Sequence, residues 1–401
     1  MSDLPPSLMT SEPGSFARAT IVERKPQIIR QVVAENTYPL AIVAELVALA
    51  DEIAEQTLQP LHEDAADAAD WNQAWHEHEG KTWLELPWYF AETYFYRRLL
   101  QAVRYLQPGP WQFHDPFGVQ KQRQEAQAVR QLAAGWAGLQ AAEPDLVFEM
   151  LLYSALWGNR ADLSNFTLQV QAQAGLAARD ERHLLLIDHT PLVHEFLRRW
   201  VQRLAIVTDN VGLDLLFDLA LADFLLQQGW VGQVVFYLKD RPFFVSDAMP
   251  GDAERAVELL RADGEPAVSG LGQRLAEAVR SGGIRLSTDP FWSSFRMFPD
   301  LPDPLRAELA TADLTILKGD VNYRRLLDDR HWPYTTAFES VAERFRLPRP
   351  FLVLRTLKGE IMVGLGPEQA EQLAAADPTW LINGKRGVIQ AVGLSASLAH
   401  R

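Results

Sequence analysis

Apolar residues in the N-terminal part of the chain recur at the spacing of helix faces. Four of them, at intervals of four, three and four residues, fall on one face of a helix: Ile42, Leu46, Leu49 and Ile53. Residues 122–141 are rich in Gln and Ala and predict a second, partly exposed helix. The pattern predicts a mostly α-helical domain over residues 21–190. Residues 1–20 contain Pro, Ser and Gly and are expected to form a flexible tail.

From about residue 191 the pattern changes to short apolar runs separated by helices. The runs predict strands at residues 203–208, 233–238, 284–287, 313–317, 351–355 and 387–392, with helices at residues 214–228 and 252–261 between the first of them. Alternation of strands and helices implies parallel strands joined by crossover helices. Residues 191–401 are therefore predicted to form an α/β domain with a largely parallel sheet.

Composition narrows the class of protein. The chain has 401 residues, a formal net charge of -14 and no cysteine. The absence of cysteine excludes disulfides, thiolate metal sites and cysteine nucleophiles. The acidic balance argues against general nucleic-acid binding, although a small anion can still bind in a local basic pocket. No secretory signal and no apolar run long enough to span a bilayer are visible, so we expect a cytoplasmic protein with no membrane partner.

Acidic and amide residues stand where several predicted strands end. Asp209 and Asn210 follow the first strand, Asp247 ends an apolar run over residues 243–246, and Asp320 follows the fourth strand. The carboxyl ends of parallel strands are where α/β proteins bind ligands. Carboxylate and amide oxygens suit a divalent cation such as Mg²⁺ or Mn²⁺. A plain helix cap would explain Asp209-Asn210 taken alone.

Cationic residues stand in the same kind of setting. Lys318 opens a polar segment after the fourth strand, which continues Gly319-Asp320-Val321-Asn322-Tyr323-Arg324. Lys358 follows the fifth strand. This mixture of groups suits a polyhydroxy substrate that carries a phosphate. Lys and Arg side chains would bind the phosphate, and Asp or Asn side chains would form hydrogen bonds with the hydroxyls. A polar strand-to-helix loop would have a similar composition.

The helical part offers further candidates. Asn159 and Asp162 interrupt an apolar stretch and could line the site, or Asp162 could simply cap a helix. Glu92 could face the same cleft. The aromatic residues of the surrounding segment could form a binding platform, but at helical spacing they are more often part of a core: Trp83, Trp88 and Tyr94.

At these residues the chain resembles the metal-dependent damage-control phosphatases, a family long catalogued as a domain of unknown function. Within that family it resembles the subgroup that contains proteins named as acidic-residue methyltransferases. The resembling segments are PWYFAETYFYRR (87–98), LWGNRADLS (156–164), residues 209–226, FFVSD (243–247), KGDVNYRRL (318–326) and RTLK (355–358). They occur in family order and together cover most of the chain.

The resemblance implies a helical N-terminal portion packed on an α/β domain, with the site at the carboxyl ends of the strands. It implies a divalent metal (Mn²⁺, Ni²⁺, Co²⁺ or Mg²⁺) held by Asp209, Asn210 and Asp247, which are also the predicted catalytic residues. It implies that residues 320–324 and Lys358 contact the phosphorylated substrate. The RTLK segment is associated with relatives that act on sugar phosphates such as fructose phosphates.

We therefore expect a metal-dependent phosphomonoesterase that acts on small phosphorylated metabolites, with a possible role in metabolite damage control. Asp214, which stands where the eukaryotic members are expected to have Glu, and Lys318 are predicted as further substrate contacts. The alternative is an S-adenosylmethionine-dependent protein carboxyl methyltransferase. Such a cofactor site usually has a Gly-rich turn after the first strand, where only Gly212 stands. Water and Asp209 are both candidate nucleophiles, and the oligomeric state is left open.

Overall fold

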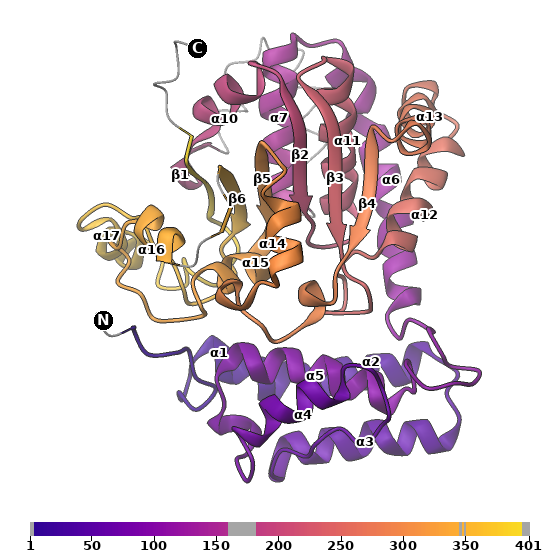
Figure 1. The fold of residues 1–401 in the computed structure, drawn as a ribbon, viewed down its shortest axis with the longest axis vertical. Helices are drawn as coiled ribbons and strands as arrows, with labels where there is room; N and C mark the ends of the chain where they lie inside the picture. Colours follow the sequence, from indigo (N-terminus) through magenta and orange to yellow (C-terminus); the bar gives the residue numbers. More distant parts are fainter. Residues whose placement is uncertain (1–3, 159–181, 345–346, 349, 395–401) are drawn as a thin grey trace.

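The computed structural model describes residues 4–158, 182–344, 347–348 and 350–394, and it has two parts (Figure 1). A layer of helices from the N-terminal region lies across one end of an α/β part that contains the sheet. The helices of this layer are α1 (Phe16–Ala19), α2 (Lys25–Glu35), α3 (Leu40–Glu55), α4 (Ala68–His76) and α5 (Trp88–Ala102).

Within the described residues, one sheet forms the centre of the α/β part, and its strand order is β1-β7-β6-β5-β2-β3-β4. The strands are β1 (Leu185–Asp188), β2 (Val201–Val207), β3 (Val231–Leu238), β4 (Ile284–Thr288), β5 (Leu314–Lys318), β6 (Phe351–Thr356) and β7 (Gly387–Val392). Neighbouring strands are parallel except β6 and β7, which are antiparallel. The predicted α/β class with a largely parallel sheet is confirmed.

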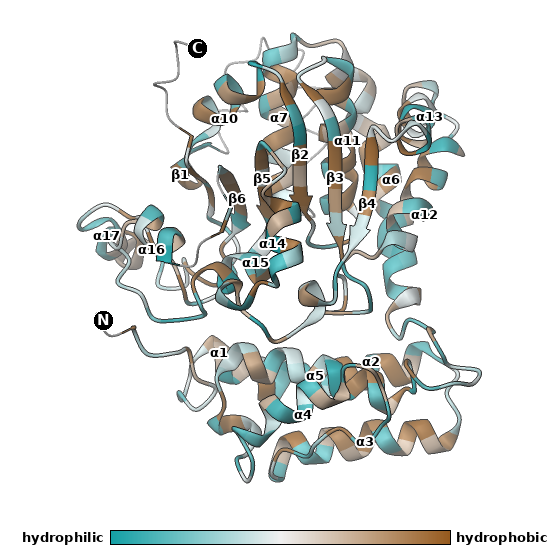
Figure 2. Cartoon of the chain, in the orientation of Figure 1, coloured by the Kyte–Doolittle hydropathy of each residue, from teal (hydrophilic) through white to brown (hydrophobic). Residues whose placement is uncertain are grey.

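The sheet is buried on both faces, as parallel sheets usually are. Along β2, Leu204 and Ile206 pack into one core while Ala205 and Val207 pack into the other, because successive side chains point to opposite faces. Figure 2 shows the resulting hydrophobic colouring of β5 and β6. The first face is covered by α6 (Gly118–Gln140), α7 (Pro144–Trp157), α11 (Leu213–Gln227), α12 (Pro250–Arg261) and α13 (Pro266–Ser281). The second is covered by α14 (Asp303–Leu309), α15 (Gly319–Leu326) and α16 (Phe338–Arg344).

The strand order places a ligand-binding crevice between β2 and β5. From β2 the chain runs outward to β3 and β4, whereas β5 and β6 lie on the other side of β2. In open α/β sheets, ligands bind outside the carboxyl ends of the strands at such a switch point. Figure 1 shows that the carboxyl ends of β2 and β3 point toward the helical layer. The helical layer therefore covers the edge where ligands are expected.

The six predicted strands are all present, with ends that shift by no more than two residues. Strand β1 was not predicted and lies inside the segment interpreted as helical. It is a four-residue edge strand that, among the described residues, pairs with β7 alone, and its side chains are half-buried. So short a run, without an alternating pattern, carries little strand signal.

Two predicted boundaries need correction. Residues 4–19 do not form a loose tail: Leu8 is fully buried, and its backbone exchanges hydrogen bonds with Asp329 and Trp88. The helical domain does not extend to residue 190 as a separate unit, because α6 and α7 pack on the sheet in the same core as β2 and β3. A helix that faces a sheet has the same apolar spacing as one that faces other helices, so the pattern alone cannot assign it to a domain.

Two of the three aromatic residues considered for a binding platform belong to the core of the helical layer, and the third, Trp88, is buried in a smaller cluster. Trp83 and Tyr94 are fully buried, in one cluster with Ile42 and Leu46. Burial favours the core interpretation over a binding platform. Among the described residues, no helix combines the length and apolar character that crossing a bilayer requires.

Candidate functional site

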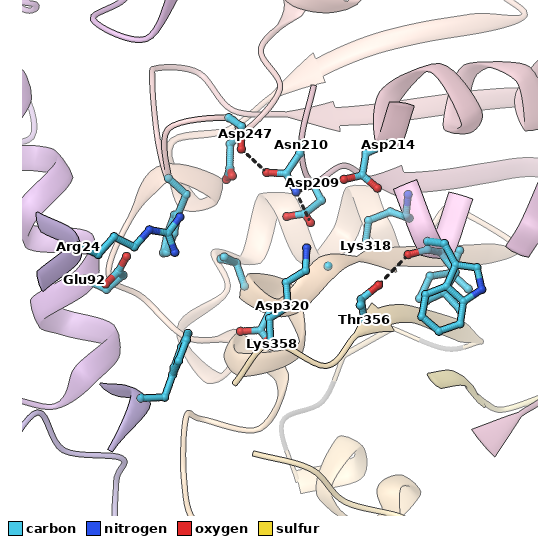
Figure 3. Close-up of a pocket in the computed structure, with 18 of the residues that line it drawn as sticks. Arg24, Glu92, Asp209, Asn210, Asp214, Asp247, Lys318, Asp320, Thr356 and Lys358 are labelled. Carbon is cyan, nitrogen blue, oxygen red and sulfur yellow. Dashed lines mark hydrogen bonds between the residues drawn. The ribbon is translucent and has the colours of Figure 1, made fainter. Parts of the chain in front are cut away.

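A cavity of about 250 Å³ lies at the carboxyl ends of β2, β5 and β6, under the helical layer (Figure 3). Its residues come from both parts of the chain. The α/β part contributes Leu156, Trp157, Asp209, Asn210, Asp214, Phe244, Ser246, Asp247, Lys318, Gly319, Asp320, Val321, Leu354, Thr356 and Lys358, and the helical layer contributes Phe16, Arg24, Trp88 and Glu92. Eight of the predicted site residues therefore line one cavity.

Backbone pairing brings the predicted metal ligands together. Asn210 and Asp247 form an isolated antiparallel bridge between the end of β2 and the loop after β3. Val211 N donates to Ser246 O at 2.8 Å, and Ala248 N donates to Asp209 O at 2.9 Å. These bonds fix the two loops against each other, so the side chains of Asp209, Asn210 and Asp247 reach the cavity from a rigid base.

The Asn210 side chain connects the acidic groups. Its Nδ2 donates to Asp209 Oδ2 at 2.8 Å and to Asp214 Oδ2 at 3.2 Å, and its Oδ1 accepts from Ser246 Oγ at 2.6 Å. A carbonyl oxygen has two lone pairs, so Oδ1 keeps one for a ligand. Gly158, with φ +50°, makes room for Asp214, because a Cβ at this position would lie 1.9 Å from Asp214 Oδ1.

The acidic groups repel one another in a buried setting. Burial, together with the nearby carboxylates of Asp247 and Asp214, raises the pKa of Asp209 well above its usual range. Burial also raises the pKa of Asp247, against the opposing effect of Lys239, whose Nζ lies 3.3 Å from Asp247 Oδ2. A divalent cation at this place would favour the ionised forms of both carboxylates.

Oxygen donors dominate this set, as a hard cation requires. The set is small, however: within the described residues, no group of three or more His, Cys, Asp or Glu side chains is placed to hold a metal ion. Two carboxylates and the amide oxygen of Asn210 are the groups that fit one. Ligands of this kind leave the remaining positions of the ion to water and substrate.

The α/β part contributes two lysines to the cavity, and the helical layer adds Arg24. Lys318 is buried, and its Nζ donates to Asp218 Oδ1 at 2.5 Å. Burial alone would lower the pKa of Lys318, but Asp218 and Asp214 outweigh it and raise the pKa, so this side chain stays protonated. Lys358, after β6, is exposed and lines the same cavity (Figure 3). One buried and one exposed ammonium group therefore line the cavity.

Only the first two residues of the predicted 320–324 segment line the cavity, namely Asp320 and Val321. Asp320 accepts from Arg324 Nε at 2.6 Å and from Arg355 Nε at 2.8 Å. Burial would raise the pKa of Asp320, but these two guanidinium groups outweigh it and lower the pKa to about 2. Asp320 is thus a permanent carboxylate at the cavity wall.

Three residues predicted to contact substrate lie behind that wall. Arg324 is fully buried, and its guanidinium lies 3.9 Å from the centre of the Trp88 ring. Asn322 Nδ2 donates to Lys318 O at 2.7 Å, and Tyr323 packs in the second core of the sheet. Asp320, in the first turn of α15, lines the cavity, whereas the three residues that follow Val321 are buried. Asn159 and Asp162 lie outside the described residues.

The cavity also contains residues that were not predicted. Phe16 and Arg24 precede all the resembling segments, and no motif marked them. Trp88 and Ser246 lie inside resembling segments, so the signal was present but was not assigned to the site. Glu92 was considered for the cleft and does line it.

The switch point of a largely parallel sheet, where this acidic centre and its lysines lie, is the place at which α/β proteins bind small ligands. In the comparison with known families, the damage-control phosphatase ARMT1-like domain matches residues 20–373. The chain belongs to this family.

Relatives support the same assignment along almost the whole chain. The damage-control phosphatase ARMT1 of Mus musculus is 32% identical over 437 residues, which cover 97% of this chain and 99% of the relative. ARMT1 of Homo sapiens is 32% identical over 446 residues, with the same coverage. A crystal structure of a DUF89 family protein from Pyrococcus horikoshii aligns over 94% of this chain and 97% of that chain, with a TM-score of 0.49 and 14% identity.

Proposed function

We propose that this protein is a metal-dependent phosphomonoesterase that acts on small sugar phosphates. The observation that carries the proposal is the convergence of Asp209, Asn210 and Asp247 with two lysines in one small cavity. The family name points to phosphatase activity. The permanent carboxylate of Asp320 adds a hydrogen-bond acceptor for substrate hydroxyls, as a sugar phosphate would require.

A divalent metal held by Asp209, Asn210 and Asp247 would polarise the phosphoryl group and offset its charge. Lys358 is placed to bind phosphoryl oxygens, and its exposure allows it to follow the substrate into the cavity. Lys318 contributes a fixed positive charge because Asp218 holds its ammonium group in place. Phe16 and Trp88 line the cavity on the side of the helical layer, where their rings would displace water from a bound substrate.

The test is phosphate release from hexose phosphates, pentose phosphates and nucleotides, with Mg²⁺, Mn²⁺, Co²⁺ or Ni²⁺ and with a chelator. We expect metal-dependent release from the sugar phosphates. Asp209→Ala should abolish it, and Lys358→Ala should lower kcat by about 100-fold, as is typical when one transition-state contact is removed. Asp51→Asn, an isosteric change at an exposed position of α3, is the control and should leave the rates unchanged.

Two results would contradict the proposal. One is phosphate release from the folded protein at the same rate with and without the chelator, which would contradict the metal dependence. The other is the absence of release from every compound in the panel with every metal, which would contradict the phosphatase activity.

A further inference from the structure

The wall of the cavity that the helical layer forms contains a carboxylate that the proposed chemistry does not use. Glu92, on α5, lines the cavity and is 1% exposed. Figure 3 shows Glu92 beside Arg24 on one side of the cavity, with Asp209 and Asp247 across it. Glu92 is therefore separate from the metal ligands while it faces the same ligand space.

Only one of the two carboxylate oxygens of Glu92 is satisfied. Lys25 Nζ donates a hydrogen bond to Oε1. Oε2 is buried and has no hydrogen-bond partner among the described residues. A buried acceptor without a donor costs free energy, and such groups in native proteins usually have a partner. The cavity is the side from which a ligand can supply that partner.

Lys25 decides what kind of partner fits. It is fully buried and lies 4.8 and 4.7 Å from the ring centres of Phe95 and Tyr96, so Glu92 is its only carboxylate partner in the described part of the chain. Burial lowers the pKa of Lys25 to about 8, although Glu92 opposes this shift. Lys25 thus supplies a counter-charge for Glu92 inside the helical layer. Arg24 lines the same cavity but makes no hydrogen bond to Oε2, so a neutral donor such as a hydroxyl completes the site.

We propose that Glu92 is a specificity-determining residue of this site, whose Oε2 accepts a hydrogen bond from a substrate hydroxyl remote from the phosphate, and that Lys25 is the positioning residue that holds it there. This inference rests on the proposed phosphatase function and narrows its substrate class. The phosphate lies at the lysine and metal side, and the hydroxyl-bearing end lies under the helical layer. Phosphomonoesters without an alcohol hydroxyl cannot form this hydrogen bond, so Glu92 does not raise kcat/KM for them.

The test compares kcat/KM for a hexose phosphate with kcat/KM for phenyl phosphate, which has no hydroxyl group. In Glu92→Gln the amide oxygen must face the Lys25 ammonium. The amide NH₂ group, a donor, then takes the place of Oε2, the acceptor, at the cavity. We expect the ratio of the two kcat/KM values to fall about 10- to 100-fold, the worth of one hydrogen bond to a charged group. Glu55→Gln, the same change at the exposed end of α3, should leave the ratio unchanged.

A double variant covers the case in which a buried unpaired charge prevents folding. Lys25→Met/Glu92→Met removes the pair and leaves apolar groups of similar length, a replacement that folded proteins often tolerate. It should show the same loss of selectivity. Lys25→Met alone should raise KM for the hexose phosphate more than it lowers kcat, and it should have no further effect on selectivity in a chain that already has Glu92→Met.

The outcomes distinguish failure of the proposed phosphatase activity from failure of the proposed hydroxyl contact. If the wild-type protein cleaves neither compound, the proposed function fails, and the role of Glu92 fails with it. If the wild type is active and the variants lose both substrates equally, or lose neither, the phosphatase stands and the hydroxyl contact is wrong. In the second case the partner of Oε2 is water or another group of the protein.

Discussion

At the scale of single residues, the site depends on how far along a short helix each side chain stands. Asp320 and Arg324 are four residues apart on α15 and form an ion pair, yet Asp320 lines the cavity and Arg324 is buried under Trp88. The sequence offered both as substrate contacts, because a polar segment after a strand does not show which residues point inward. Arg324 acts on the site through Asp320, whose charge it maintains with Arg355.

Gly319 is a position at which the site leaves no room for a side chain. Its φ is +82°, and a Cβ would lie 2.1 Å from Asp209 Oδ2. Gly319→Ala should therefore displace the Asp209 carboxylate and lower phosphatase kcat/KM by at least about 10-fold, because misplacement of a catalytic group by about 1 Å can cost about 100-fold.

Gly282 provides a matched control for that change. It has the same φ of +82°, but a Cβ there would meet nothing within 4 Å. Gly282→Ala should cost about 1 kcal/mol of unfolding free energy from backbone strain and leave kcat/KM unchanged. Equal loss of activity in both variants would mean that the effect comes from backbone strain and not from contact with Asp209.

At the scale of elements, the strands of the sheet were predictable, whereas the composition of the site was only partly so. Central strands such as β5 are short, buried and mostly apolar, and each is followed by polar residues. One segment of sequence therefore shows both the strand and the end that faces the site. Arg24 and Phe16 reach the cavity only because the helical layer covers the sheet edge. No local pattern encodes a contact between segments separated by hundreds of residues. The side chains that form the second wall therefore require the tertiary structure.

The short helix α1 is an element whose position depends on a distant side chain. The carboxylate of Glu360, after β6, accepts hydrogen bonds from Phe16 N at 3.0 Å and Ala17 N at 3.2 Å. An acidic group at a helix N-terminus satisfies donors that the helix itself cannot. Glu360→Ala should speed amide hydrogen exchange at residues 16 and 17 by about tenfold or more, the worth of hydrogen bonds to a charged acceptor.

Hydrogen exchange followed by mass spectrometry would measure this in peptides that cover residues 10–20. Glu371→Ala, an exposed acid in the first turn of α17, is the matched control and should leave those peptides unchanged. Exchange at residues 16 and 17 that is indifferent to Glu360→Ala would show that α1 is held by other contacts.

At the scale of the whole molecule, the net charge of the chain differs in sign from several of the charges that surround the acidic centre. The net charge is -14, yet Lys239, Lys318 and Lys358 all influence the acidic centre. Overall charge thus says little about the ligand, because the local arrangement at the sheet edge decides it. In the metal-free protein, repulsion from Asp247 and Asp214 disfavours the ionised form of Asp209, since burial withholds the solvent that would screen these charges.

That repulsion gives the metal a measurable effect on global stability. A cation that binds only the folded state adds about 2.7 kcal/mol at a concentration 100 times its dissociation constant. Mn²⁺ should therefore raise the melting temperature of the wild-type protein, and a chelator should reverse the rise. Asp209→Asn removes one of the clustered carboxylates, so it should melt higher than the wild type without metal and lose the response to Mn²⁺, as expected when a functional site is strained for its ligand.

Asp51→Asn, at the exposed surface of α3, should melt and respond like the wild type. A full Mn²⁺ response in Asp209→Asn would place the ion elsewhere, and a lower melting temperature without metal would mean that the Asp209 carboxylate stabilises the free site instead of straining it.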